Sequence, residues 1–363
     1  MPKISIRHPK ENPDLFGYDQ IKEFVLENFS KGKLHHALLI SGKKGIGKAT
    51  FAYHLAYHML SFENHESKNR NDLDLFNNPK EYQSKFSIDE NSPTYSKIKA
   101  GSHPDLLAIE IETDEKTHKL HKEITVESIR KIKNFLNLTP AISNYRIVIV
   151  DSVDEMNINA ANALLKALEE PPQKTFLFLI SHNNKTLDTI YSRCQQLKIP
   201  APNYDYWKKT LENLFDSQTS SKETDFRLLS MLSDNSISIA LDIMAHDGTN
   251  LYHNIIRSLR NKDNLTTIHK LADEITANDS YWILFSYIIN LLINRAIKLG
   301  SLGKLDFISE IERKILEELV RTHSIEELFS YLDSFNNLIS DVSRININKK
   351  QVIINIFSKL LIL

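Results

Sequence analysis

Short apolar runs alternate with helical patterns over the first two hundred residues. His36–Ser41, Arg146–Asp151 and Thr175–Ser181 are mostly apolar, and Asp105–Glu112 alternates in the manner of a strand. Apolar residues recur at helical spacing in residues 16–34, 48–60, 126–138 and 160–168. Because strands alternate with helices, the pattern predicts a parallel sheet covered by helices on both faces.

The pattern changes after residue 200. Pro200 and Pro202 disfavour a continuing helix, and beyond them nearly every segment has the apolar spacing of a helix. Earlier, residues of about 62–99 are rich in Asn, Asp, Glu, Lys and Ser and have no sustained periodicity, which is typical of an exposed insertion. We therefore predict an α/β domain over residues 1–200, with a polar insertion, followed by an all-helical region.

One later segment, Tyr281–Leu299, has the apolar character of a candidate membrane span. It carries Asn290, Asn294 and Arg295, and its charge-free part is short. Stretches of that length are more often buried core helices than spans, and the N-terminus has no apolar signal segment. The sequence therefore predicts a soluble protein without membrane contacts, for which the cytoplasm is the default location.

Charge and cysteine content exclude some classes of function. The 363 residues hold 45 Lys and Arg against 46 Asp and Glu, a formal net charge of −1. Any contact with DNA must therefore come from a local patch rather than from a globally basic surface. Cys194 is the single cysteine, so one chain can form neither a disulfide framework nor a cysteine-based zinc site.

A phosphate-binding loop is predicted between the first strand and the helix that follows it. Gly42, Gly45, Gly47 and Lys48 fit the first seven positions of the P-loop pattern. Glycines let backbone N–H groups wrap around a phosphate, the helix N-terminus adds positive potential, and the lysine reaches the β- and γ-phosphates. A glycine-rich turn that binds nothing is the alternative, which the order of strand, loop, lysine and helix disfavours.

Two residues that ATP hydrolysis needs are missing from this predicted site. Ala49 stands where a working loop has Ser or Thr to place a hydroxyl on Mg²⁺, and Thr50 lies about 100° further round the helix. Asp151 ends an apolar strand and could hold Mg²⁺ through water. Ser152 follows it and cannot polarise an attacking water as a glutamate would.

The most specific strings in the chain surround these motifs. They are Asn162–Pro172, Ser192–Cys194, Leu34–Gly42 and Ala100–Asp105. Together they closely resemble bacterial DNA polymerase III clamp-loader subunits, above all those of the delta prime type. The resemblance spans most of residues 16–200, and beyond Pro200 it rests on helical character alone.

The resemblance implies a three-domain AAA+ chain. Residues 1–200 would form the RecA-like P-loop domain, residues 201–247 a small helical lid and residues 248–363 a helical collar. In that family five subunits form an open ring through their collars and load the sliding clamp onto primed DNA. The partners implied are tau/gamma-type ATPases and a delta-type subunit. The polymerase activity would belong to the DNA polymerase III holoenzyme, and this chain would not itself be an active ATPase.

The resemblance also gives Arg193 a role. The arginine of the family's Ser-Arg-Cys motif acts in trans on the ATP of a neighbouring subunit, which suits a permanently charged planar group. The alternative is an arginine that pairs with a carboxylate at a helix end.

Other family features are missing. The chain lacks the zinc-binding cysteines of many members, and Asn235–Ala240 has no sensor arginine. We therefore expect no zinc and no required cofactor, while weak ATP or ADP binding through Lys48 stays open.

Three hypotheses follow. The first is a non-hydrolysing, delta prime-like subunit that supplies Arg193 to its neighbour. The second is a catalytic tau/gamma-type subunit of the same assembly, against which Ala49 and Ser152 argue. The third is a free-standing P-loop NTPase, which would need Ser or Thr at position 49 and an acid at position 152.

Overall fold

The chain divides into two compact units. The structure is a computed structural model that describes residues 8–62, 86–111, 123–182, 188–214, 225–260, 265–345 and 347–362. One unit is Ser5–Leu214, and Phe215–Leu363 belongs to the other. The finer division at residues 200 and 247 stays a prediction.

A five-stranded parallel sheet forms the centre of the first unit. Its order is β2–β3–β4–β1–β5. The strands are β1 (Ala37–Ser41), β2 (Leu106–Glu110), β3 (Arg146–Asp151), β4 (Thr175–Ser181) and β5 (Gln195–Lys198). The predicted parallel α/β fold is therefore confirmed. The apolar pattern missed β5 because this edge strand has only four residues, of which Leu197 alone is buried.

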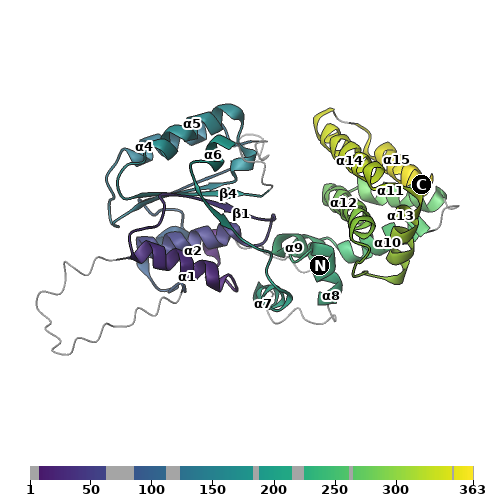
Figure 1. Ribbon diagram of the computed structural model, residues 1–363, viewed down its shortest axis with the longest axis horizontal. Helices are drawn as coiled ribbons and strands as arrows, with labels where there is room; N and C mark the ends of the chain where they lie inside the picture. The colour runs from purple at the N-terminus through teal and green to yellow at the C-terminus, as the bar shows by residue number, and fades with distance from the viewer. Residues whose placement is uncertain are drawn as a thin grey trace, which may run out of the picture. The chain divides into compact units, whose positions relative to one another are not determined.

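Helices cover both faces of the sheet (Figure 1). One face is covered by α1 (Asp19–Ser30), α2 (Lys48–Leu60) and α3 (Pro93–Lys99), and the other by α4 (Val126–Leu136) and α5 (Ile158–Glu169). Alternate residues of β1 serve the two layers, since Leu38 and Ile40 pack on the first face and Ala37 and Leu39 on the second. Burial on both faces explains why β1, β3 and β4 read as continuous apolar runs. The unit also contains α6 (Asp188–Tyr191), α7 (Tyr204–Leu214) and two 3-10 turns, Pro9–Glu11 and Val153–Glu155.

The end of the predicted polar insertion is anchored to the core by a few apolar side chains. Residues 86–99 include α3, whose Tyr95 and Ile98 are buried, and Phe86 packs against the same cluster. Most of these residues are exposed as expected, but the expectation missed the apolar side chains that anchor this short helix to the core. Residues 63–85 lie outside the described residues.

A buried pair of opposite charges shapes the loop between α4 and β3. The Asp105 carboxylate accepts backbone N–H groups of residues 141–143 at 2.6 to 2.9 Å. The Arg146 guanidinium, 3.8 Å from it, donates to the carbonyls of Phe135 and Thr139 at 2.6 Å. Burial opposes the charge of Asp105, but these hydrogen bonds hold its pKa below the usual range. The pair thus satisfies backbone groups that no strand or helix serves.

The second unit is entirely helical in the part that the structure describes. Its helices are α8 (Phe226–Ser233), α9 (Ile237–Ala245), α10 (Gly248–Arg260), α11 (Leu265–Thr276), α12 (Asp279–Leu302), α13 (Glu310–Thr322), α14 (Ile325–Ile345) and α15 (Lys349–Ile362). By length and composition α12 could cross a membrane. Trp282, Phe285 and Ile289 are nevertheless buried against neighbouring helices, and Arg295 pairs with the buried Glu312. These contacts support the interpretation of α12 as a core helix.

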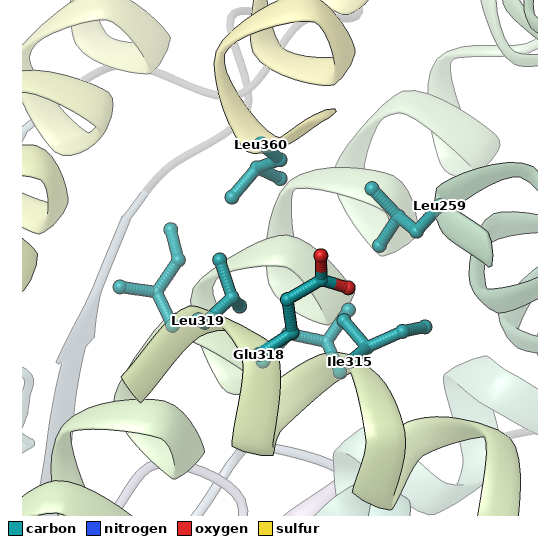
Figure 2. Close-up of a pocket in the computed structure, with 7 residues that line it drawn as sticks. Leu259, Ile315, Glu318, Leu319 and Leu360 are labelled. Carbon is teal, nitrogen blue, oxygen red and sulfur yellow. The ribbon is translucent and has the colours of Figure 1, made fainter. Parts of the chain in front are cut away.

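A small cavity lies among α10, α12, α13 and α15. Its volume is about 30 Å³, room for about one water molecule. Figure 2 shows the Glu318 carboxylate pointing into the space between Leu259 and Leu360. The cavity is too small for a cofactor.

Replacing Asp105 with Ala should destabilise the first unit. It leaves Arg146 with an uncompensated charge and three N–H groups without their acceptor, which together cost roughly 3 kcal/mol or more. Chemical denaturation of the variant measures this loss. Glu127→Ala is the matched control, because Glu127 is an exposed carboxylate 3.9 Å from Arg130 and should leave the transition unchanged. Equal stability of both variants would contradict the role given to the buried pair.

Candidate nucleotide site

Four strand ends meet at the carboxyl edge of the sheet. Glu110 ends β2, Asp151 ends β3, Ser181 ends β4 and Ser41 ends β1. The register places Glu110 beside Asp151 and Ser41 beside Ser181. This edge is where parallel α/β sheets hold their ligands, and the loop from β1 to α2 lies on it.

The loop needs glycine at each of its three glycine positions. Gly42, Gly45 and Gly47 have φ of 150°, 78° and 94°, conformations that other residues rarely adopt. A Cβ at Gly42 would also lie 2.4 Å from the carbonyl oxygen of Ile199. Gly47 is the N-cap of α2, so the loop delivers the chain into the helix N-terminus as the P-loop pattern predicts.

Lys48 points back into this loop. Its ammonium group donates to the carbonyl of Gly42 at 2.7 Å and to that of Lys43. The side chain is buried, and burial lowers its pKa to about 8 against the opposing effect of Asp151 and Asp154. A phosphate entering the loop would take over the hydrogen bonds that the two carbonyls now accept.

Asp151 lies among other acids. Burial, followed by repulsion from Glu110 and Glu155, raises its pKa to about 6, and Lys48 opposes the shift. The Glu110 carboxylate accepts Tyr53 Oη at 2.9 Å and lies 3.0 Å from His8 Nε2. An added cation would relieve this repulsion.

The residues after Asp151 do not replace the missing glutamate. Ser152 is fully buried, and its hydroxyl has no hydrogen-bond partner among the described residues. The Asp154 carboxylate accepts Ser181 Oγ at 2.9 Å and the backbone N–H of His182, so it is committed to the end of β4. Glu155 lies 3.9 Å from the ammonium group of Lys44.

Sequence reasoning missed Glu110 and His182 at this edge. Glu110 closes its strand with a carboxylate just as Asp151 does, which was an available signal. His182 follows β4 directly, and its Nε2 lies 3.6 Å from Asp151 Oδ1. Burial, with Lys48 and Lys44 nearby, lowers its pKa to about 4, so near pH 7 it is a neutral neighbour of the acid.

The residues present fit a phosphate better than a magnesium triphosphate. The loop glycines, the N-terminus of α2 and Lys48 have the features that an anion site requires. Ala49 offers no metal ligand, which leaves Asp151 as the predicted metal contact. No group of three or more His, Cys, Asp or Glu able to hold a metal occurs among the residues that the structure describes.

Arg193 lies near the amino-terminal ends of the strands, whereas the phosphate loop follows their carboxyl-terminal ends. The pairing of β1 with β5 runs from Leu38 beside Gln195 to Ser41 beside Lys198. Arg193 precedes the first residue of β5, whereas the phosphate loop follows the last residue of β1. The paired segment that separates them covers three residue steps, about 10 Å, so Arg193 is not part of its own chain's predicted phosphate site.

The side chain of Arg193 is bound within its own chain. Its Nη2 lies 2.6 Å from Glu169 Oε1, at the end of α5, and its Nη1 donates to the carbonyl of Thr189 at 2.9 Å. A carboxylate at a helix end is the contact that the structural alternative expects. The geometry therefore pairs Arg193 with Glu169 in the isolated chain. Its trans role stays a proposal.

Residues 17–203 match a family model described as DNA polymerase III, delta subunit. DNA polymerase III subunit delta′ of Pseudomonas aeruginosa is 33% identical over 168 residues, 46% of this chain and 44% of that protein. The gamma subunit of Buchnera aphidicola is 28% identical over 246 residues, 66% of this chain and 58% of that protein. The chain thus spans about half the length of these relatives. A gamma subunit-related structure from Thermotoga maritima is 19% identical, with a TM-score of 0.42 and coverage of 94% of this chain and 98% of that one.

Replacing Asp151 with Asn should stabilise the protein near neutral pH. A carboxyl whose folded-state pKa is raised to about 6 destabilises the fold above that pH, and this cost disappears as the pH falls to about 4. We expect the free energy of unfolding to rise by about 2 kcal/mol at pH 7 and to be unchanged near pH 4. Denaturant titrations at both pH values measure the difference, with the exposed Asp205→Asn as control. A variant no more stable than wild type at pH 7 would contradict the electrostatic description of this edge.

Proposed function

The chain belongs to the family described as DNA polymerase III, delta subunit, and from that premise we propose that it is a non-hydrolysing, delta prime-type clamp-loader subunit. One observation carries this proposal. The chain's predicted phosphate site has no metal-binding hydroxyl at position 49 and no acid at position 152, while Arg193 lies at the other end of the strands. A subunit that completes a neighbour's site but not its own needs this separation.

In this proposal Arg193 reaches the ATP of an adjacent tau/gamma-type subunit. An arginine supplied in trans stabilises the charge that develops on the transferring phosphoryl group, and it must come from a surface rather than from the chain's own cleft. The side chain of Arg193 is 36% exposed, which leaves it accessible. A delta-type subunit would complete the ring, which would act on the sliding clamp and primed DNA in the cytoplasm.

A catalytic tau/gamma-type subunit is the second candidate. Relatives named gamma and tau align with up to 66% of this chain, and two relatives named delta′ align with 46% and 71% of it, so the extent of alignment does not separate the two candidates. Ala49 and Ser152 oppose it because each removes a group on which magnesium-dependent hydrolysis depends.

The purified chain should not hydrolyse ATP alone. Without a hydroxyl at position 49 or an acid at position 152, neither the metal nor the attacking water is held in place. A phosphate-release assay with Mg²⁺ measures the turnover, and a tau/gamma-type subunit assayed alongside is the positive control. Robust magnesium-dependent turnover by the isolated chain would favour the catalytic alternative.

Replacing Arg193 with Ala should impair the assembled complex and not the chain's folding. Loss of a trans arginine lowers turnover at the site that it serves by roughly 10³-fold or more, so total ATP turnover should fall by that site's share. Arg130→Ala is the matched control, because Arg130 is also exposed and lies 3.9 Å from a glutamate. Unchanged turnover in the Arg193→Ala complex would exclude the trans role.

A further inference from the structure

All three guanidinium nitrogens of Arg193 contact oxygen atoms of its own chain. Nε donates to Glu169 Oε1 at 2.8 Å, and Nη2 lies 2.6 Å from the same oxygen. Nη1 donates to the carbonyl of Thr189 at 2.9 Å and to Ser192 Oγ at 3.4 Å. Glu169 is the charged partner that the structure records for Arg193.

We propose that Glu169 is a positioning residue that holds the Arg193 guanidinium in the isolated subunit, which we call its parking role. In the assembled ring the terminal phosphate of a neighbour's nucleotide competes with Glu169 for this guanidinium. This inference rests on the proposed trans role of Arg193. Carboxylate and phosphate are both oxyanions that accept from guanidinium N–H groups. Because both groups need the same N–H donors, Arg193 must leave the Glu169 carboxylate when it binds the neighbour's phosphate.

The backbone on both sides of this contact is fixed. Glu169 is the last residue of α5, whose end is closed by a hydrogen bond from Glu170 N to the carbonyl of Lys166. His36 Nε2 lies 3.0 Å from the carbonyl of Leu168. Arg193 N donates to the carbonyl of Ile190 at the end of α6. The parts of this contact that are free to change are therefore the two side chains rather than the backbone.

The contact is weak enough to be exchanged. The side chains of Arg193 and Glu169 are 36% and 50% exposed, and ion pairs of such exposure change an equilibrium by no more than about fivefold. Two nitrogens also converge on a single oxygen, rather than forming the stronger fork with one oxygen each. Glu169 thus orients the guanidinium and delays its engagement without preventing it.

The test measures ATP turnover against ATP concentration in a complex reconstituted with tau/gamma-type and delta-type subunits. Glu169→Gln keeps the shape of the side chain but removes its charge. At low salt we expect the share of turnover that is lost in Arg193→Ala to reach half its maximum at a two- to fivefold lower ATP concentration, with unchanged kcat. The difference should vanish near 0.5 M salt, where exposed charges are screened. Glu169→Asp, which keeps the charge, should lie closer to wild type.

Glu170→Gln is the matched control, because Glu170 is the exposed glutamate next in the chain and should behave as wild type. If Glu169→Gln equals wild type at low salt, or lowers kcat at both salt concentrations, the parking role is wrong. Arg193→Ala, measured in the same complex, separates the two proposals. An effect of Arg193→Ala without an effect of Glu169→Gln removes the parking role alone, whereas no effect of Arg193→Ala removes the trans role as well.

Discussion

The parallel pairing of β1 with β5 is the constraint on which the arrangement of charges depends. Every strand of the sheet runs in the same direction, so the phosphate loop after β1 and Arg193 before β5 must lie at opposite edges. About 10 Å of hydrogen-bonded strand separates them, and small movements of side chains do not close that distance. The fold thus keeps the predicted phosphate loop and an accessible arginine apart.

The charged groups at the two ends of the strands differ in how they are paired. At the carboxyl edge Glu110 and Asp151 end adjacent strands. Burial, followed by repulsion from Glu110 and Glu155, raises the pKa of Asp151, while Lys48 donates to loop carbonyls. At the amino edge Arg193 meets Glu169 in a half-exposed pair. The first arrangement is costly without a cation, whereas the second is readily exchanged. This difference is consistent with a dormant phosphate site and a working arginine.

Much of the fold could be predicted from the sequence, because burial on both faces imposes an uninterrupted apolar pattern. Both β3 and β4 begin and end at the predicted residues. The polar edge strand β5 and the short helix α3 were missed, since each anchors on only one or two apolar positions. At the site, Gly42 and Lys48 follow from local motifs. The neighbours of Asp151 and the pairing of Arg193 with Glu169 do not, because they join segments that only the tertiary fold brings together.

The central claim is that this chain completes a neighbour's nucleotide site and not its own. A structure of the assembled complex, trapped with Mg²⁺, ADP and a phosphoryl transition-state analogue, tests it most directly. We expect the Arg193 guanidinium at about 3 Å from the analogue in the adjacent subunit, released from Glu169, with no magnesium triphosphate at the chain's own loop. Arg193 still bound to Glu169 at an occupied interface, or magnesium and nucleotide held at Lys48 and Asp151, would contradict it.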